Sequence, residues 1–122
     1  MIGYVTLGTN DGARSARFYD ALLGTFGAKR IMEIGPFILW GTSFAEPCLA
    51  VTTPYDKKPA TVGNGVMVAL RARSKEEVNA LYAKALELGG TDEGPPGPRA
   101  DGFYAGYFRD LDGNKLNAFF MG

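Results

Sequence analysis

Asn117 is a short polar residue inside an aromatic stretch near the end of the chain, FYAGYFRDLDGNKLNAFF (residues 103–120). Residues 115–120 alternate with a period of two, as expected of a strand, so Asn117 and Phe119 share one face. A hairpin here can present one row of side chains to a pocket and the other to a core. The amide of Asn117 could then donate and accept hydrogen bonds to a ligand. The alternative is a polar strand residue that its neighbours satisfy.

Three further aromatic residues are expected to face the same pocket: Tyr4, Trp40 and Tyr107. They could form an aromatic wall for a flat or apolar ligand. Ordinary core and strand packing is the more common role of such residues. Thr6 falls on the same face of the first strand as Tyr4 and joins the predicted pocket.

Cys48 and Ala50 share the pocket-facing side of the predicted fourth strand. The chain contains no histidine, so no imidazole can activate the thiol, and a small structural role is favoured over a nucleophile. Arg99 lies in a proline-stiffened loop, residues 94–99, near the expected pocket edge. It could bind an anion, although a solvated loop arginine is the more common case.

Composition excludes several classes of protein. The 13 basic and 13 acidic residues balance, and no basic stretch suits a phosphate backbone, so we expect no nucleic-acid partner. No apolar run approaches the length of a membrane span, and residues 1–11 do not form a signal peptide.

A single cysteine excludes an intrachain disulfide and favours the cytoplasm. The 122 residues are expected to form a single domain, 1–122.

The first half follows the order strand–helix–strand–strand–strand. Its strands are predicted at residues 2–9, 28–34, 37–42 and 48–53. The helix is expected to begin after a cap at Asn10 or Asp11 and to end at Gly24 or Gly27. Residues 54–62 contain two prolines and two lysines and are expected to form a linker.

The same order restarts after the linker. A strand is expected at residues 66–71, Ser74 and Glu77 form a capping box, and Gly89-Gly90 ends the second helix. A weak strand near residues 91–93 precedes the stiff loop. The hairpin around the turn Asp110–Asn114 then closes the chain.

The restart is a repeat with a constant offset in sequence number. The offset from Tyr4 to Met67 is the same as the offset between the two expected caps, Asp11 and Ser74. This register predicts an α+β fold of two tandem βαβββ modules, about residues 1–58 and 62–122. They would form a curved mixed sheet around a cleft, with both helices outside.

The sequence resembles the vicinal oxygen chelate superfamily, which includes glyoxalase I, bleomycin- and fosfomycin-resistance proteins and extradiol dioxygenases. The resemblance rests on Asn-Asp before a helix with Phe-Tyr-x-x-Leu-Leu, on the restart, and on Arg-Asp-x-Asp-Gly-Asn-Lys-Leu at residues 109–116. It covers essentially the whole chain, and the closing motif is diagnostic of fold more than of reaction. Because members commonly pair, the resemblance also implies a homodimer.

Many members of that superfamily hold a divalent metal through His and Glu side chains on the first and fourth strands of each half. The resemblance places the equivalent positions here at Tyr4, Ala50, Met67 and Asn117. None of these side chains suits a tight metal site. We therefore expect no metal and no cofactor.

Two functions remain open. The preferred hypothesis is a metal-independent protein that binds a small organic molecule, as drug-sequestering members of the superfamily do. The alternative is a glyoxalase-like lyase, an isomerase or a dioxygenase-related enzyme of unknown substrate. An enzyme would need an acid or base, and the carboxylates near strand ends, Glu33 and Glu46, lack the alternation and setting expected of one. The sequence assigns no catalytic residue.

Overall fold

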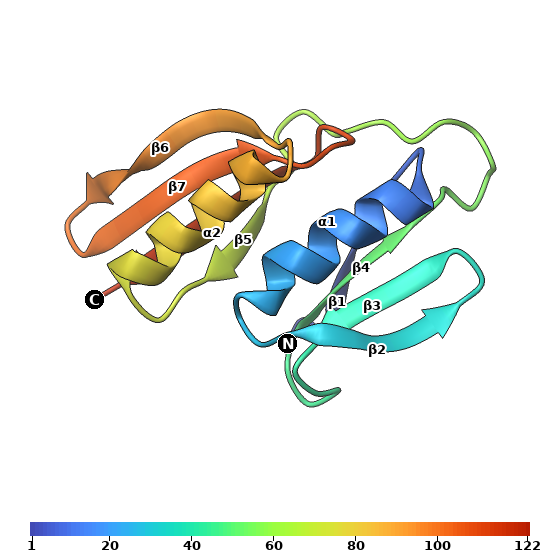
Figure 1. Cartoon of the computed structure of the whole chain (residues 1–122), viewed down its shortest axis with the longest axis horizontal. Helices are drawn as coiled ribbons and strands as arrows, with labels where there is room; N and C mark the ends of the chain where they lie inside the picture. Colours follow the sequence, from blue (N-terminus) through green and yellow to red (C-terminus); the bar gives the residue numbers. More distant parts are fainter. The chain divides into compact units, whose positions relative to one another are not determined.

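The structure is a computed structural model that describes all 122 residues. The chain divides into two compact units, Met1–Val62 (unit 1) and Gly63–Gly122 (unit 2). Each unit contains one helix and its own four-stranded mixed sheet, in the order βαβββ (Figure 1). The predicted α+β fold of two tandem modules is therefore confirmed.

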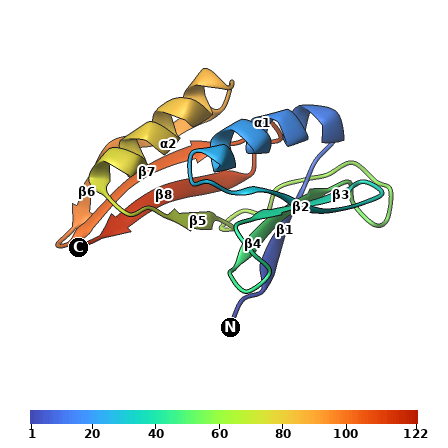
Figure 2. The same cartoon turned by 60° about the horizontal axis from the view of Figure 1, so that its bottom comes forward.

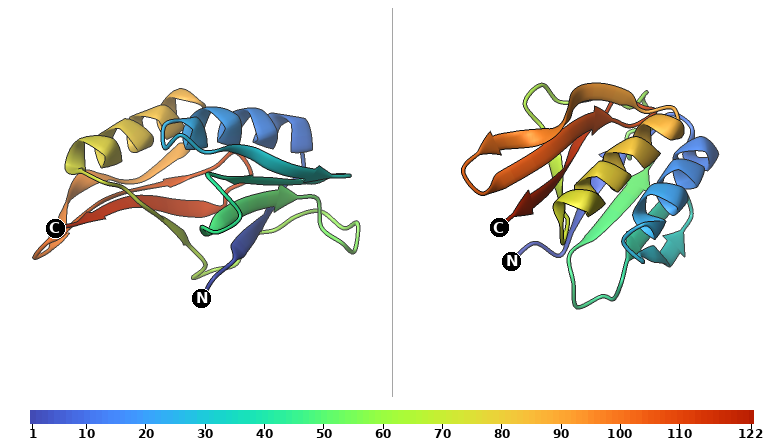
Figure 3. Two further views of the ribbon diagram at one scale, coloured as in Figure 1. Left: turned by 90° about the horizontal axis from the view of Figure 1, so that it is seen from below. Right: turned by 60° about the vertical axis from the view of Figure 1, so that its left-hand side comes forward.

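Unit 1 has its helix on one face of its sheet (Figure 3). Its elements are β1 (Tyr4–Gly8), α1 (Gly12–Gly24), β2 (Lys29–Ile34), β3 (Phe37–Gly41) and β4 (Cys48–Thr52). The strand order is β1-β4-β3-β2, in which β1 and β4 run parallel and the other pairs are antiparallel. β1 is shorter than the predicted strand at residues 2–9.

The amphipathic pattern of α1 explains its position. The side chain of Asp11 caps the helix by accepting a hydrogen bond from the Arg14 backbone N–H at 3.1 Å. Phe18, Tyr19 and Leu22 are buried at helical spacing and fix α1 against the sheet. The chain leaves the helix through Gly27, whose φ of +78° favours glycine.

Unit 2 repeats this arrangement, with its helix on one face of its sheet (Figure 2). Its elements are β5 (Val68–Arg71), α2 (Lys75–Glu87), β6 (Thr91–Ala100), β7 (Phe103–Arg109) and β8 (Lys115–Met121). The strand order is β5-β8-β7-β6, in which β5 and β8 run parallel. The Ser74 hydroxyl accepts from the Glu77 backbone N–H, and the Glu77 carboxylate accepts from the Arg73 backbone N–H. The capping box thus reaches one residue further back than predicted.

β6 corrects the prediction of a loop at residues 94–99, because these residues lie inside a ten-residue strand. β6 pairs only with β7, at the edge of the sheet, and its register shifts along the way. An edge strand tolerates prolines, which lack the N–H that an inner strand needs, and bulges absorb the shifts. The prolines and glycines of this stretch therefore mark an irregular edge strand.

The turn between β7 and β8 is built on Asp110, as predicted. Its Oδ1 accepts hydrogen bonds of 2.9 Å from the backbone N–H groups of Asp112 and Asn114. Gly113 has a φ of +88°, which favours glycine. This turn sets the register of the hairpin, in which Tyr107 lies opposite Asn117.

The constant offset of the repeat is confirmed in the helices. The offset from Tyr4 to Met67, applied to the bounds of α1, Gly12–Gly24, gives the bounds of α2, Lys75–Glu87. The two N-caps, Asp11 and Ser74, have the same offset.

The sheets also repeat, and their registers match position by position. Thr6 pairs with Ala50 in unit 1. The same offset carries Thr6 onto Ala69, which pairs with Asn117 in unit 2. Ala50 and Asn117 therefore occupy equivalent positions in the two sheets.

The expected linker, residues 54–62, contains no helix or strand. It is attached to unit 1 through Asn10, whose Oδ1 accepts from the Ala60 backbone N–H at 2.7 Å. Both helices have 13 residues, and neither is long and apolar enough to cross a membrane.

Candidate functional site

Each sheet has one face under its own helix and an opposite face, which we call the helix-free face. In unit 2, the Tyr104 hydroxyl donates to Asn79 Oδ1 of α2 at 2.8 Å, and a Cβ at Gly106 would meet the Tyr82 ring of α2. This row of β7 therefore faces α2. Because side chains alternate along a strand, the helix-free face carries the other row. Its residues on β7 and β8 include Ala105, Tyr107, Lys115, Asn117 and Phe119.

Asn117 lies in the middle of the helix-free face of unit 2, between Ala69 of β5 and Tyr107 of β7. Its side chain is buried, with 1% exposure, and its Oδ1 has no hydrogen-bond partner. Leaving a buried amide oxygen without a donor costs roughly 1–3 kcal/mol. The neighbours thus do not satisfy this side chain, which favours the interpretation of Asn117 as a ligand contact.

Two cations contact the ring of Tyr107. Arg99 Cζ lies 5.5 Å from the ring centroid, and Lys115 Nζ lies 5.7 Å from it. Arg99 reaches the ring from β6 and donates from Nη2 to the Pro95 carbonyl. Neither Arg99 nor Lys115 forms an ion pair. The ring contact places Arg99 beside Tyr107, one of the predicted pocket residues.

A third cation on this face is neutralised. Arg109 Nε donates to Glu93 Oε1, and its Nη1 donates to the Gly113 carbonyl at 2.9 Å. The hydrogen bond and the charge of Arg109 hold the pKa of Glu93 below its ordinary value, with a smaller contribution from Lys115. Arg109 is thus paired with Glu93, whereas Arg99 and Lys115 are not in ion pairs, an electrostatic setting that suits an anion.

Apolar side chains continue the helix-free face of unit 2. Phe119 stacks on Phe103 with a centroid separation of 5.5 Å and an angle of 18° between the rings. Met67 immediately precedes β5 and is 40% exposed. These residues can contact an apolar group of a ligand.

In unit 1, four of the predicted pocket residues lie on the helix-free face. Cys48 pairs with Tyr4, and Ala50 pairs with Thr6, so the four residues form two adjacent pairs. Tyr4 is 57% exposed and meets Phe37 edge to face. Phe37 belongs to the row of β3 that points away from α1.

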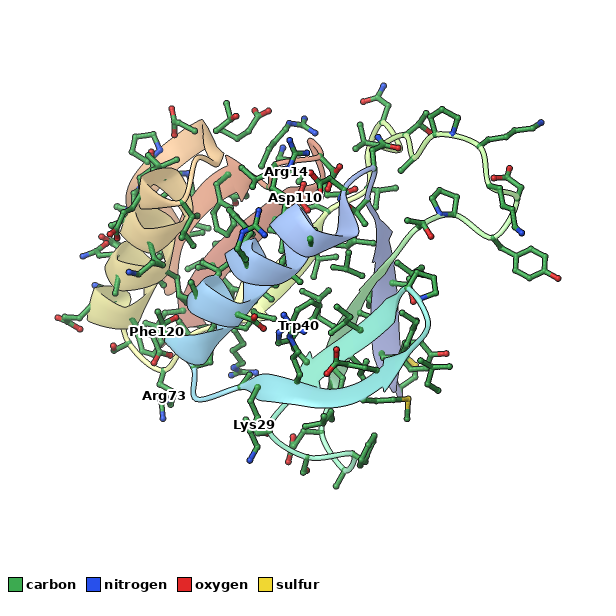
Figure 4. The ribbon with its side chains drawn as sticks, turned by 45° about the vertical axis from the view of Figure 1, so that its right-hand side comes forward. Arg14, Lys29, Trp40, Arg73, Asp110 and Phe120 are labelled. Atoms are coloured by element: carbon green, nitrogen blue, oxygen red, sulfur yellow. The ribbon has the colours of Figure 1, made fainter.

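Trp40 does not belong to this row, which corrects the prediction of a pocket-facing indole. It lies between α1 and the sheet (Figure 4), where its Nε1 donates to Asp20 Oδ1 at 2.9 Å and its ring contacts Tyr19. Asp20 also accepts two hydrogen bonds from Arg30. The bonds from Arg30 and Trp40 hold the pKa of Asp20 below its ordinary value, although burial opposes this shift. Trp40 is a core residue of unit 1.

The Cys48 thiol is engaged by its own loop. Its Sγ lies 3.5 Å from the Ser43 carbonyl oxygen and 3.2 Å from that of Glu46, and its single S–H can donate to either. No base contacts it, which favours the structural role. The two carboxylates considered in the sequence, Glu33 and Glu46, are both exposed, and Glu33 pairs with Arg30.

The four positions that the resemblance implies for a metal do not fit one. Ala50 has no donor atom, Tyr4 is a phenol, Met67 offers a soft thioether, and Asn117 offers one neutral oxygen. No group of three or more His, Cys, Asp and Glu side chains that could hold a metal ion is present. The donor set is unsuited to a divalent cation.

Two pockets have linings that contain no predicted site residue. One, of about 170 Å³ in unit 2, is lined by residues that include Phe103, Tyr104 and Phe120. The other, of about 430 Å³ in unit 1, lies between α1 and the β2–β3 hairpin and includes Arg17 and Arg30. Neither contains a buried polar atom without a partner, so we centre the candidate site on Asn117.

Sequence reasoning missed Lys115 as a site residue, although the alternation of β8 places it in the row of Asn117. The contact of Arg99 with Tyr107 had no such signal. The pairing places Gly94, not Arg99, opposite Tyr107. Arg99 lies five residues further along β6, beyond the register shifts, and reaches the ring only through its long side chain.

The chain belongs to the Glyoxalase/Bleomycin resistance protein/Dioxygenase superfamily, because the model of that family matches residues 1–118. The predicted resemblance is thereby confirmed. Members of this superfamily bind small molecules.

Solved structures agree with this assignment. The chain is 39% identical to a glyoxalase/bleomycin resistance protein from Albidiferax ferrireducens T118, with a TM-score of 0.90 and coverage of 98% of this chain and 97% of that one. A glyoxalase-related enzyme from Fulvimarina pelagi is 25% identical, with a TM-score of 0.77 and coverage of 98% and 87%. A lactoylglutathione lyase from Agrobacterium tumefaciens is 20% identical, with a TM-score of 0.70 and coverage of 98% and 92%, and it shows the fold alone. No curated protein matches the chain.

Proposed function

We propose that the protein binds a small organic molecule without a metal ion, and that the centre of the site is the helix-free face of unit 2. The residues of that unit in the proposed site are Met67, Arg99, Tyr107, Asn117 and Phe119. In unit 1, Tyr4, Thr6, Cys48 and Ala50 are proposed as the ligand-contacting residues of that unit's own helix-free face.

The observation that carries the proposal is the state of Asn117. Its oxygen is buried without a partner, at the position where the resemblance implies a metal-binding Glu. A neutral amide cannot replace the charge of a carboxylate toward a cation, but it can bind a donor on an organic ligand. Aromatic side chains beside it offer the apolar contacts common in ligand sites.

Elemental analysis of protein purified without chelators tests the metal-independent part. We expect far less than one zinc, nickel, iron or manganese ion per chain, and no rise in melting temperature when these metals are added. About one ion per chain that is lost in Asn117→Leu would contradict the proposal. Native mass spectrometry of protein from its host tests the binding part, because a bound organic molecule adds mass that denaturation removes.

The alternative is an enzyme, either a lyase, an isomerase or a dioxygenase-related protein. It would require an acid or base at the site. Glu93 is the carboxylate near Tyr107, and Arg109 lowers its pKa, whereas a general acid needs a raised one. An assay for lactoylglutathione lyase activity, with and without added metal, distinguishes the two: turnover that Asn117→Leu abolishes would favour the enzyme.

A further inference from the structure

The two cations at Tyr107 indicate which chemical class the site binds. Arg99 and Lys115 both contact the ring of Tyr107, and neither forms an ion pair with a carboxylate. A ligand carboxylate beside this ring could accept charge-assisted hydrogen bonds from both cations. Arg99 still has N–H groups available beyond the one given to Pro95, and the Lys115 ammonium has three.

The oxygen of Asn117 requires a different group on the same ligand. Oδ1 only accepts hydrogen bonds, and no donor of the protein reaches it. The ligand must therefore supply an N–H or O–H group at this point. A ligand that carried only a carboxylate would leave the oxygen unsatisfied.

The order of groups along β8 sets the order of groups on the ligand. Lys115, Asn117 and Phe119 follow one another on the helix-free face. The Lys115 ammonium reaches the ring of Tyr107, which lies opposite Asn117, so the charged group extends along the row toward Asn117. A complementary ligand carries an anionic group, then a hydrogen-bond donor, then a flat apolar group. Phe119, stacked on Phe103, can contact the last of these.

We propose that the ligand is a small carboxylic acid with an adjacent hydrogen-bond donor and a flat apolar group. In this arrangement Arg99 and Lys115 bind the carboxylate, and Asn117 Oδ1 accepts from the donor. The inference rests on the proposed binding function and adds the ligand class to it.

Three related compounds separate these contributions. Hippurate carries a carboxylate, an amide N–H and a ring in the required order. Methyl hippurate lacks the charge, and N-methylhippurate lacks the donor. In calorimetric titrations we expect hippurate to bind about tenfold more tightly than either compound.

A pair of lysine variants provides a matched control. Lys115 and Lys75 both lie 5.7 Å from a tyrosine ring centroid, Tyr107 and Tyr104, but these tyrosines lie on opposite faces of one sheet. Lys115→Met should weaken hippurate binding about tenfold and leave methyl hippurate binding unchanged. Lys75→Met should change neither, and Arg99→Gln should act like Lys115→Met.

The outcomes distinguish the ligand class from the binding function. Equal affinity for hippurate and methyl hippurate, or equal effects of the two lysine variants, would overturn the carboxylate assignment. The absence of hippurate binding at millimolar concentration would overturn it as well. A neutral molecule that copurifies with the protein would then leave the proposed function standing without the ligand class.

Discussion

At Asn117, a polar side chain is buried where an apolar one of similar size would satisfy the same packing. The amide oxygen has no partner, although its neighbours on both adjoining strands are in place. Proteins tolerate such a loss of stability at sites of function, because a ligand supplies the missing contact.

Asn117→Leu should therefore stabilise the protein in the absence of ligand. Removing the unpartnered oxygen is expected to raise the free energy of unfolding by roughly 1 kcal/mol in urea denaturation. Asn114→Leu is the control, because Asn114 is also buried but donates to Asp110 Oδ2 at 2.9 Å. That variant should lower the free energy of unfolding by roughly 1–3 kcal/mol. Destabilisation of both variants to the same extent would contradict our account of Asn117.

Asp20 gives unit 1 a dependence on pH. Its pKa lies below the ordinary value of 3.8 in the folded protein, chiefly because Arg30 donates to it. Such a group stabilises the fold above its unfolded pKa, and this contribution is lost as the pH falls through the lowered folded value. The wild-type protein should thus lose stability on acidification from about pH 5 to about pH 3.

Asp20→Asn should show a smaller loss over the same range, since the amide keeps an acceptor for Trp40 but does not titrate. Urea unfolding followed by Trp40 fluorescence measures both proteins, and Asp101→Asn, in an exposed turn, is the control. Identical pH profiles for wild type and Asp20→Asn would show that another group carries the dependence.

The residues of the site were partly readable from the sequence. Alternation along β8 places Asn117 and Phe119 in one row, because a period of two is a local property of the strand. Alternation does not say which row meets the helix. Trp40 lies in the row that meets the helix, where Asp20 of α1 accepts a hydrogen bond from the indole N–H and holds the ring in the core.

At the scale of the elements, the helices were predictable because their signals are local. Asp11 and Ser74 each accept from the backbone N–H three residues ahead, and the apolar stripes follow at helical spacing. The weak strand expected near residues 91–93 is the start of β6, but its extension to Ala100 was not predictable. Pro95, Pro96 and Pro98 resemble loop residues until the strand is known to lie at a sheet edge.

Removing either cap tests the equivalence of the two helices. Asp11→Ala and Ser74→Ala should each lower the free energy of unfolding by about 1 kcal/mol, because each leaves one N–H of the first turn without its acceptor. Asp11→Ser and Ser74→Asp keep an acceptor and serve as controls that should retain most of the stability. A cap whose removal has no effect in urea denaturation would not be the local start signal that we infer.

At the scale of the whole molecule, the repeat explains why one unit predicts the other. Its constant offset carries α1 and β1 onto α2 and β5, and β8 pairs with β5 in the same register as β4 pairs with β1. Comparing equivalent positions of the two sheets also shows where the units differ. Where unit 1 has Ala50, unit 2 has Asn117, so the polar centre of the proposed site is specific to unit 2.

We further predict a homodimer, as the resemblance implies. Ile2, Tyr4 and Phe44 are all more than half exposed, and β1 and the loop before β4 bring them to one end of the sheet of unit 1, where Gly3 accepts from the Cys48 backbone N–H. Exposed apolar groups that gather in this way favour a protein interface.

Light scattering after size exclusion should give about twice the chain mass of 13.1 kDa. Phe44→Glu should shift the protein toward the monomer by placing a charge in the interface, whereas Tyr55→Glu, a fully exposed linker residue, should leave the mass unchanged. A wild-type mass of one chain at micromolar concentration would refute the dimer, and a dimer that Phe44→Glu leaves intact would place the interface elsewhere.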